Sequence, residues 1–148
     1  MRVLLDTNVV VSALLFGGAP RALLRALCAP PFELWTSRPR LRELAAALGH
    51  NKLRAAVTRT GLTVENLVQA YTSQTFVAPD ASLPAVTFAA DPGDEPVVAT
   101  ALAVRADWLV TGDQHLLEAK GTLQCRVLTV AEALRRAGEL LSPREPRG

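Results

Sequence analysis

The sequence is poor in the residues that mark several common protein classes. It has only two cysteines and two histidines in 148 residues. Two cysteines are too few for a disulfide framework, and Cys28 and Cys125 lack metal-type spacing, so we expect buried thiols in a reducing cytoplasm. No apolar run approaches the roughly 20 residues of a membrane span, and the amino-terminus lacks the pattern of a signal peptide. We therefore expect a cytoplasmic protein without a membrane partner.

Charge of either sign is also scarce overall, because the net charge is only +2 and charged residues make up 20% of the chain. Its distribution is more informative. Basic residues gather between positions 38 and 59, and acidic residues gather between positions 80 and 118. A basic face beside an acidic focus is typical of a metal site that handles phosphates. The alternative is that both stretches are solvated helix faces.

Short apolar segments alternate with helical patterns along the chain. Residues 3–5 form an apolar run without polar alternation, which is typical of a central parallel strand. Further strands are expected at 32–36, 85–88, 107–111 and 126–129. This alternation predicts a three-layer α/β/α fold with a mostly parallel central sheet. We expect one domain over residues 1–141 and a flexible tail over 142–148.

Capping residues mark the starts of several expected helices. Ser37 can cap a helix over 38–48, Thr63 can cap another, and Thr129 with Glu132 forms a capping box for the last. Residues 49–74 predict an extra helical hairpin, which could act as a clamp over a substrate or as a dimer surface. From this block and the apolar helices we expect a homodimer.

Acidic residues recur where the expected strands give way to helices. Asp6 ends the first strand, and Glu43 lies in the second turn of the helix after the second strand. Asp94 and Glu95 open a later helix, and Asp113 follows the strand over 107–111. Because all such junctions of a parallel sheet share one edge, we expect these acids to meet. The alternative is that each is a capping or helix-dipole residue.

Carboxylates gathered at one edge would repel one another, and a divalent cation would remove that conflict. An all-oxygen set of ligands favours Mg²⁺ or Mn²⁺. Zinc is disfavoured because His50 and His115 are the only histidines and no cysteine lies nearby in sequence. Such an ion lowers the pKa of bound water and stabilises charge on a reacting phosphate.

Four motifs occur in a fixed order: Leu5-Asp-Thr-Asn-Val9 with Ser12, Ser37 through Glu43-Leu44, Glu95-x-x-Val-Ala99 with Ala101, and Leu109-Val-Thr-Gly-Asp113. No single motif is specific, but over about residues 2–136 the ordered set resembles the PIN-domain family. These are small metal-dependent ribonucleases that include VapC-like toxins of prokaryotic toxin–antitoxin pairs. The resemblance implies hydrolysis of RNA by a metal-activated water, with a small antitoxin protein as a further partner.

The resemblance also implies roles for particular residues. The catalytic acids, which hold one or two Mg²⁺ or Mn²⁺ ions, would be Asp6, Glu43, Glu95 and Asp113. The supporting residues would be Thr7, Asn8, Ser12 and Thr111. Basic residues that could hold RNA phosphates are Arg38, Arg40, Arg42 and Lys52.

The sequence departs from the family pattern at two positions. The third acid is usually aspartate, whereas the matching position here is Glu95, so Asp94 is an alternative metal ligand. Helix phase does not choose between them, and the spacing to Asp113 favours Glu95. Close relatives often carry a further acid at position 115, where this chain has His115, which we expect at the surface.

Three other functions are alternatives to a nuclease. A PIN-like binding or scaffold module would keep the fold without catalysis, but a complete set of repelling acids argues against it. A haloacid dehalogenase type of phosphatase would need aspartate in place of Asn8 and a late lysine, for which Lys120 is the only candidate. Dinucleotide binding is disfavoured because Gly17-Gly18 is not a glycine-rich phosphate loop.

Overall fold

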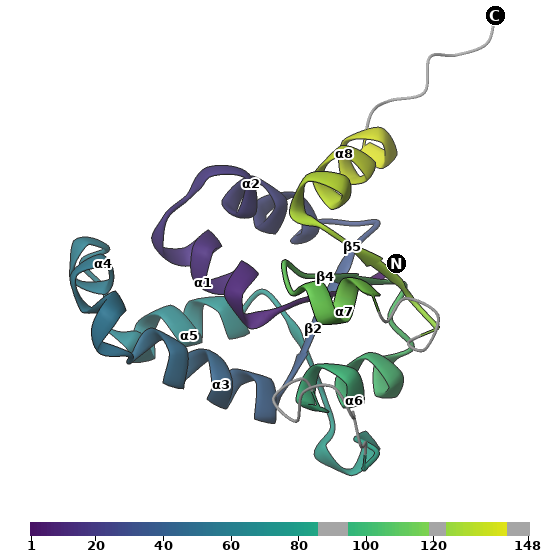
Figure 1. Cartoon of the computed structure of the whole chain (residues 1–148), viewed down its shortest axis with the longest axis horizontal. Coiled ribbons are helices and arrows are strands. Elements are labelled where there is room, and N and C mark those ends of the chain that lie inside the picture. Colours follow the sequence, from purple (N-terminus) through teal and green to yellow (C-terminus); the bar gives the residue numbers. More distant parts are fainter. Residues whose placement is uncertain (86–94, 119–123, 142–148) are drawn as a thin grey trace, which may run out of the picture.

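The computed structural model describes residues 1–85, 95–118 and 124–141 of the chain. In this part of the chain, five strands form one sheet in the order β3-β2-β1-β4-β5 (Figure 1). All four neighbouring pairs are parallel. The strands are β1 (Arg2–Leu5), β2 (Glu33–Ser37), β3 (Phe76–Ala78), β4 (Trp108–Val110) and β5 (Arg126–Leu128). The expected parallel α/β sheet is therefore confirmed.

Helices cover both faces of this sheet, which gives the three-layer arrangement that the sequence predicts (Figure 1). On one face lie α1 (Thr7–Leu15), α2 (Gly18–Leu27), α3 (Arg38–Leu48), α4 (Arg54–Arg59), α5 (Val64–Thr72) and α8 (Val130–Leu141). On the other face lie α6 (Glu95–Val104) and α7 (Gln114–Glu118). Two short 3₁₀ turns, η1 (Asn51–Leu53) and η2 (Asp80–Ser82), complete the described elements.

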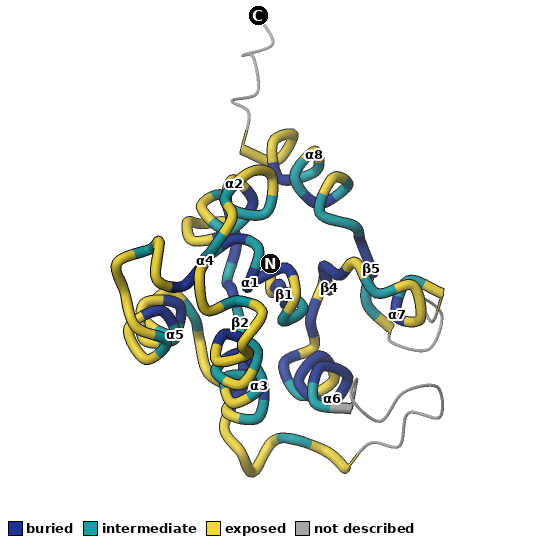
Figure 2. Tube along the Cα trace, turned by 60° about the vertical axis from the view of Figure 1, so that its left-hand side comes forward, coloured by how far each residue is buried: buried dark blue, intermediate teal, exposed yellow. Residues whose placement is uncertain are grey.

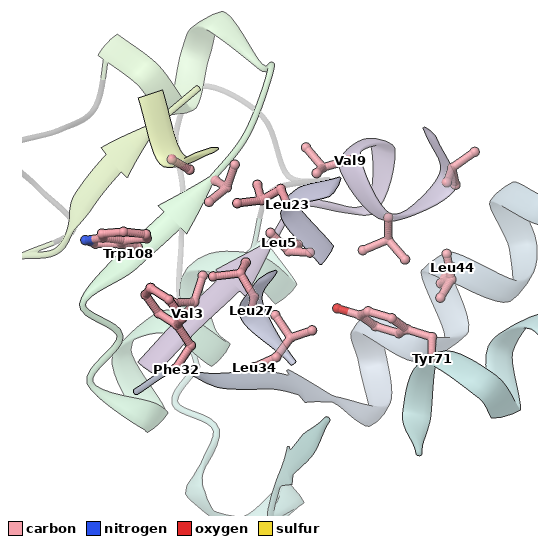
Figure 3. Packing of buried hydrophobic residues seen from close by; sticks show 14 of the residues in the cluster. Val3, Leu5, Val9, Leu23, Leu27, Phe32, Leu34, Leu44, Tyr71 and Trp108 are labelled. Carbon is pink, nitrogen blue, oxygen red and sulfur yellow. The ribbon is translucent and has the colours of Figure 1, made fainter. Parts of the chain in front are cut away.

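The central strand β1 is buried on both faces because its side chains alternate between two apolar clusters. Val3 and Leu5 pack against α1, α2 and α3, and Figure 3 shows them among the residues of that cluster. Leu4 points to the opposite cluster, beneath α6 and α7. All three side chains are fully buried, and Figure 2 shows the dark core along the sheet. This explains why the segment is apolar without alternation.

Two of the three predicted helix caps form the expected hydrogen bonds, and the third does not. The Thr63 hydroxyl accepts a hydrogen bond from the Asn66 N–H at 3.1 Å, which starts α5 within the predicted hairpin. Thr129 and Glu132 form the expected capping box. Ser37 occupies the cap position of α3, but its buried hydroxyl makes no capping bond. It lies in a fully buried strand end, where a neighbouring helix provides its partner.

The described part of the chain contains a strand that the sequence did not predict. The structure places β3 at Phe76–Ala78, whereas residues 86–88 of the predicted strand lie outside the described part. Phe76 and Val77 are exposed, because β3 is an edge strand that packs only partly onto the sheet. The strand β3 is only three residues long and directly precedes Pro79, so its apolar residues did not stand out in this Pro-rich region.

The cysteines also differ from expectation, because Cys28 is exposed and Cys125 is only half-buried. Cys28 is the C-cap of α2, beyond the last buried turn, so it does not share the environment of Leu27. Within the described ranges, no single helix is long and apolar enough to cross a membrane. Only α1 and α2 together, bent by 105°, reach that length and composition.

Candidate active site

Two of the predicted acids meet where the adjacent strands β1 and β4 end. Asp6 directly follows β1, and its backbone N–H donates to the carbonyl of Val110 in β4 at 2.8 Å. Thr111, fully buried after β4, donates its hydroxyl to Asp6 Oδ2 at 2.7 Å. The same hydroxyl accepts the backbone N–H of Asp113 at 2.9 Å. One buried hydroxyl therefore links the Asp6 carboxylate to the loop that carries Asp113.

Both aspartates also accept backbone N–H groups at helix starts, as the capping alternative predicts. Asp6 is the N-cap of α1, and its Oδ1 accepts the N–H of Thr7 at 2.8 Å. Asp113 precedes α7, and its Oδ1 accepts the N–H of His115 at 2.8 Å. The His115 side chain is exposed, as expected. These bonds fix the orientation of each carboxylate relative to the edge of the sheet.

Glu43 joins Asp6 through the first turn of α1. The hydroxyl of Thr7 donates to Glu43 Oε2 at 3.3 Å. Burial is the main cause of a raised pKa at Glu43, and the charge of Asp6 raises this pKa further. The charge of Arg40 and the hydrogen bond from Thr7 act in the opposite direction. The Glu43 and Asp6 carboxylates therefore lie close enough to interact electrostatically, as the sequence predicts.

The expected third acid lies at the start of α6. The helix α6 begins at Glu95, as predicted, but Asp94 and the side chain of Glu95 lie outside the described part. Asn8 is exposed and Ser12 is half-buried on α1, and in the described part neither side chain hydrogen-bonds to an acid of the site. Thr7 and Thr111 are the supporting residues that make such bonds.

A further pair of hydroxyls, which the sequence did not reveal, ties α6 to the same edge. Ser37 Oγ, at the end of β2, lies 2.7 Å from Thr100 Oγ1 in a buried hydrogen bond. Thr100 also donates to the carbonyl of Pro96 at 2.7 Å. This contact anchors the first turns of α6, the helix that begins at Glu95, to the end of β2. A buried threonine within an apolar helix was the available signal.

Four basic residues were expected at the surface to hold RNA phosphates, and for Arg40 this expectation is wrong because the residue is buried. Its side chain is only 4% exposed and donates from Nη2 to the Leu5 carbonyl. Arg40 precedes Leu44 and Leu48 by one and two turns, so it lies on the buried stripe of α3. The other three, Arg38, Arg42 and Lys52, are exposed.

The acidic stretch over 80–118 is not one focus. Asp80 Oδ2 forms an exposed ion pair with Arg38 Nη1 at 3.5 Å. Asp107 Oδ2 accepts the backbone N–H of Arg2 at 2.8 Å, at the opposite, amino edge of the sheet. Of the described acids in this stretch, Asp113 is the one that hydrogen bonds of Thr111 link to Asp6.

The chemistry of the described donors fits a divalent cation. They are carboxylate oxygens, supported by threonine hydroxyls, which suit Mg²⁺ or Mn²⁺. Over the described ranges, no arginine or lysine forms an ion pair with Asp6, Glu43 or Asp113. In the same ranges, no three acids, histidines or cysteines already converge as a metal cluster. The described donors are therefore of the kind that a divalent cation prefers, and the expected third acid, at residues 94–95, has its side chain outside the described part.

Comparison with known proteins places this site within a family. A family model for the PIN domain matches residues 2–115, which include every acid of the candidate site. The chain belongs to the PIN domain family, whose members are generally nucleases and typically bind divalent metal ions. A search of curated proteins found no match.

Proposed function

We propose that the protein is a metal-dependent ribonuclease whose catalytic acids are Asp6, Glu43, Asp113 and Glu95, with Asp94 as the alternative third acid. Hydrogen bonds from two threonines carry the proposal. Thr7 donates to the Glu43 carboxylate, and Thr111 donates to the Asp6 carboxylate and accepts the backbone N–H of Asp113. Acids from three distant segments are thereby held at one edge with no ion pair among the described residues to neutralise them.

In this proposal the protein orients oxygen ligands and holds the RNA. Thr111 fixes one oxygen of Asp6, and Thr7 holds one oxygen of Glu43. A bound Mg²⁺ or Mn²⁺ supplies a water of lowered pKa and stabilises charge on the phosphate. The exposed Arg38, Arg42 and Lys52 would contact backbone phosphates, which position RNA without reading its sequence.

Cleavage of single-stranded RNA in the presence of Mn²⁺ tests this proposal. EDTA should abolish cleavage, and Asp6→Asn or Asp113→Asn should each lower the rate by orders of magnitude. Asp107→Asn is the matched control, because it makes the same change at the amino edge of the sheet and should leave the rate nearly unchanged. If the two site variants cut as fast as the unaltered protein, the activity belongs to a contaminant.

The second candidate function is a non-catalytic binding or scaffold module with a PIN domain. It is favoured by the lack, within the described ranges, of three converging metal-ligating side chains. Titration calorimetry with Mn²⁺ separates the two functions. Binding that is lost in Asp6→Asn supports the nuclease. No detectable binding by the unaltered protein supports the scaffold.

We further propose a biological setting of a cytoplasmic, VapC-like toxin that is a homodimer and pairs with a small antitoxin protein. The resemblance of the four motifs supports the toxin role. Exposed Phe16 and Leu62, which line one hollow beside α1 and α5, provide apolar surface for an assembly. Sedimentation that shows only a 15.8 kDa monomer at high concentration would refute the dimer. Growth arrest relieved by a neighbouring gene product would support the toxin.

We also propose that residues 1–141 are one domain and that 142–148 are a flexible tail. Limited proteolysis should remove the tail and leave the domain intact. An early cut within 1–141 would contradict this division.

A further inference from the structure

Arg40 is a buried cation directly beneath the candidate site. Its side chain is 4% exposed, and only Nη2 has a hydrogen-bond partner, the Leu5 carbonyl. Its Nε and Nη1 atoms are buried without a partner in the described part of the chain. Burying a guanidinium with so few hydrogen bonds is costly, so an isolated arginine at this position would destabilise the fold. Its surroundings must therefore contribute to keeping the charge there.

Two carboxylates lie close to Arg40 along the chain, one on its own helix and one directly after its hydrogen-bond acceptor. Leu5, whose carbonyl accepts from Arg40, immediately precedes Asp6. Glu43 follows Arg40 by three residues on α3, so the two side chains leave the helix on neighbouring positions. Neither carboxylate forms an ion pair with Arg40 in the described ranges. Because Arg40 is buried and Glu43 is half-buried, their charges interact with less screening than two charges at the surface.

The charge of Arg40 acts on two titratable neighbours, the half-buried Glu43 and the buried Tyr71. Arg40 is the largest influence that lowers the pKa of Glu43, against the larger effect of burial. Arg40 also lowers the pKa of Tyr71, whose hydroxyl is fully buried on α5. One charge thus reaches the acid site on one side and the apolar core on the other.

We propose that Arg40 is an internal counter-cation and positioning residue of the acid site. It holds the end of β1 through the Leu5 carbonyl, and it offsets the charge of Glu43 and Asp6 when no metal is bound. Because it stays in place when a divalent ion binds, it repels that ion and weakens its affinity. The part of this inference that concerns metal affinity rests on the proposed metal-dependent function.

The competing explanation is that Arg40 only packs and hydrogen-bonds. Charge can be separated from packing with a double-mutant cycle in EDTA. Arg40→Met keeps a long apolar side chain without charge, and Glu43→Gln removes the partner charge. We expect Arg40→Met to lower Tm more in the unaltered background than in the Glu43→Gln background. Equal losses in both backgrounds would show that Arg40 acts only by packing, and would overturn the proposal.

Metal affinity gives a second and independent readout. Calorimetry with Mn²⁺ should show about three- to tenfold tighter binding for Arg40→Met than for the unaltered protein, because one repulsive charge has been removed. Arg40→Lys keeps the charge and should keep the original affinity. Arg54→Met, at an exposed arginine of α4, is the matched control and should change neither readout. Unchanged or weaker affinity in Arg40→Met would overturn the counter-cation role.

Two further outcomes are distinguishable. If Arg40→Met does not fold, Arg40→Gln replaces it in both measurements, since it removes the charge but keeps an amide donor for the Leu5 carbonyl. If the unaltered protein binds no Mn²⁺, the proposed metal-dependent function is wrong. The Tm cycle in EDTA still decides whether Arg40 compensates Glu43, because that measurement involves no metal.

Discussion

Replacing Thr111 with valine tests whether a single buried hydroxyl organises the acid site. Valine has nearly the same shape as threonine, so the change removes the hydrogen bonds and leaves the packing. The structure gives this hydroxyl two partners, Asp6 Oδ2 at 2.7 Å and the Asp113 N–H at 2.9 Å. The first bond involves a charged acceptor, and the second leaves a backbone donor without its partner.

The expected loss of stability follows from these two bonds. A hydrogen bond to a charged group contributes roughly 1.5–3 kcal/mol, and an unpartnered buried donor costs about 1–3 kcal/mol. Because some solvent reaches Asp113, we expect a total of about 2–3 kcal/mol for Thr111→Val. For a chain of this size, that corresponds to a fall in Tm of roughly 5–10 °C, measured by thermal unfolding in EDTA.

The expected loss of function is larger than the loss of stability suggests. Residues that orient metal ligands typically change affinity or activity about 10–100-fold when they are removed. We therefore expect Thr111→Val to lower RNA cleavage by about that factor at a temperature where the variant is still folded. Thr111→Ser keeps the hydroxyl and loses only a methyl group, so it should retain most of the activity. If serine is the damaging change and valine is tolerated, packing rather than hydrogen bonding organises this edge.

Two further predictions concern buried titratable groups. Burial raises the pKa of Glu43 above 4.5, so in EDTA the fold loses stability as pH rises through the raised value. The Tm of Glu43→Gln minus the Tm of the unaltered protein should therefore increase as the pH rises from acid to neutral. A difference that does not depend on pH would contradict this. Tyr71 is the only tyrosine, and burial raises its pKa from 10.0 to about 12. Tyrosinate absorbance should therefore rise near pH 12, and the unaltered protein should lose stability there, whereas Tyr71→Phe should not. A titration midpoint near 10.0 in the folded protein would refute the raised pKa.

The parts of the fold that the sequence could predict are those with strong local signals. The apolar run ending at Leu5 predicts a central strand, because a strand buried on both faces needs no polar alternation. The capping residues Thr63 and Thr129 predict helix starts, because their partners lie only three residues away. Acids directly after strands could be placed at one edge because parallel strands share their direction.

The parts that could not be predicted depend on contacts between distant segments. Ser37 has the sequence signal of a helix cap, but Thr100, 63 residues further along the chain, forms the hydrogen bond instead. Arginine is a residue type expected at a phosphate-binding surface, yet Arg40 lies on the same face of α3 as Leu44 and Leu48 and is buried with them. The spacing of four residues from Arg40 to Leu44 and from Leu44 to Leu48 is itself a sequence signal for a buried position. Figure 3 shows Leu44 on the same buried side of α3 as the apolar core.

The register between β1 and β4 decides whether the candidate site exists. Leu5 pairs with Val110, so Asp6 and Thr111, the next residue on each strand, stand at the same level. Leu4 and Leu109 face one apolar cluster, whereas Leu5 and Val110 face the other. A slip of one residue would exchange the two faces of β4 and separate the Thr111 hydroxyl from Asp6. Apolar packing on both sides of the sheet therefore fixes the hydrogen bond from Thr111 to Asp6. Through the same hydroxyl, this bond connects two segments whose acids, Asp6 and Asp113, are 107 positions apart in the chain.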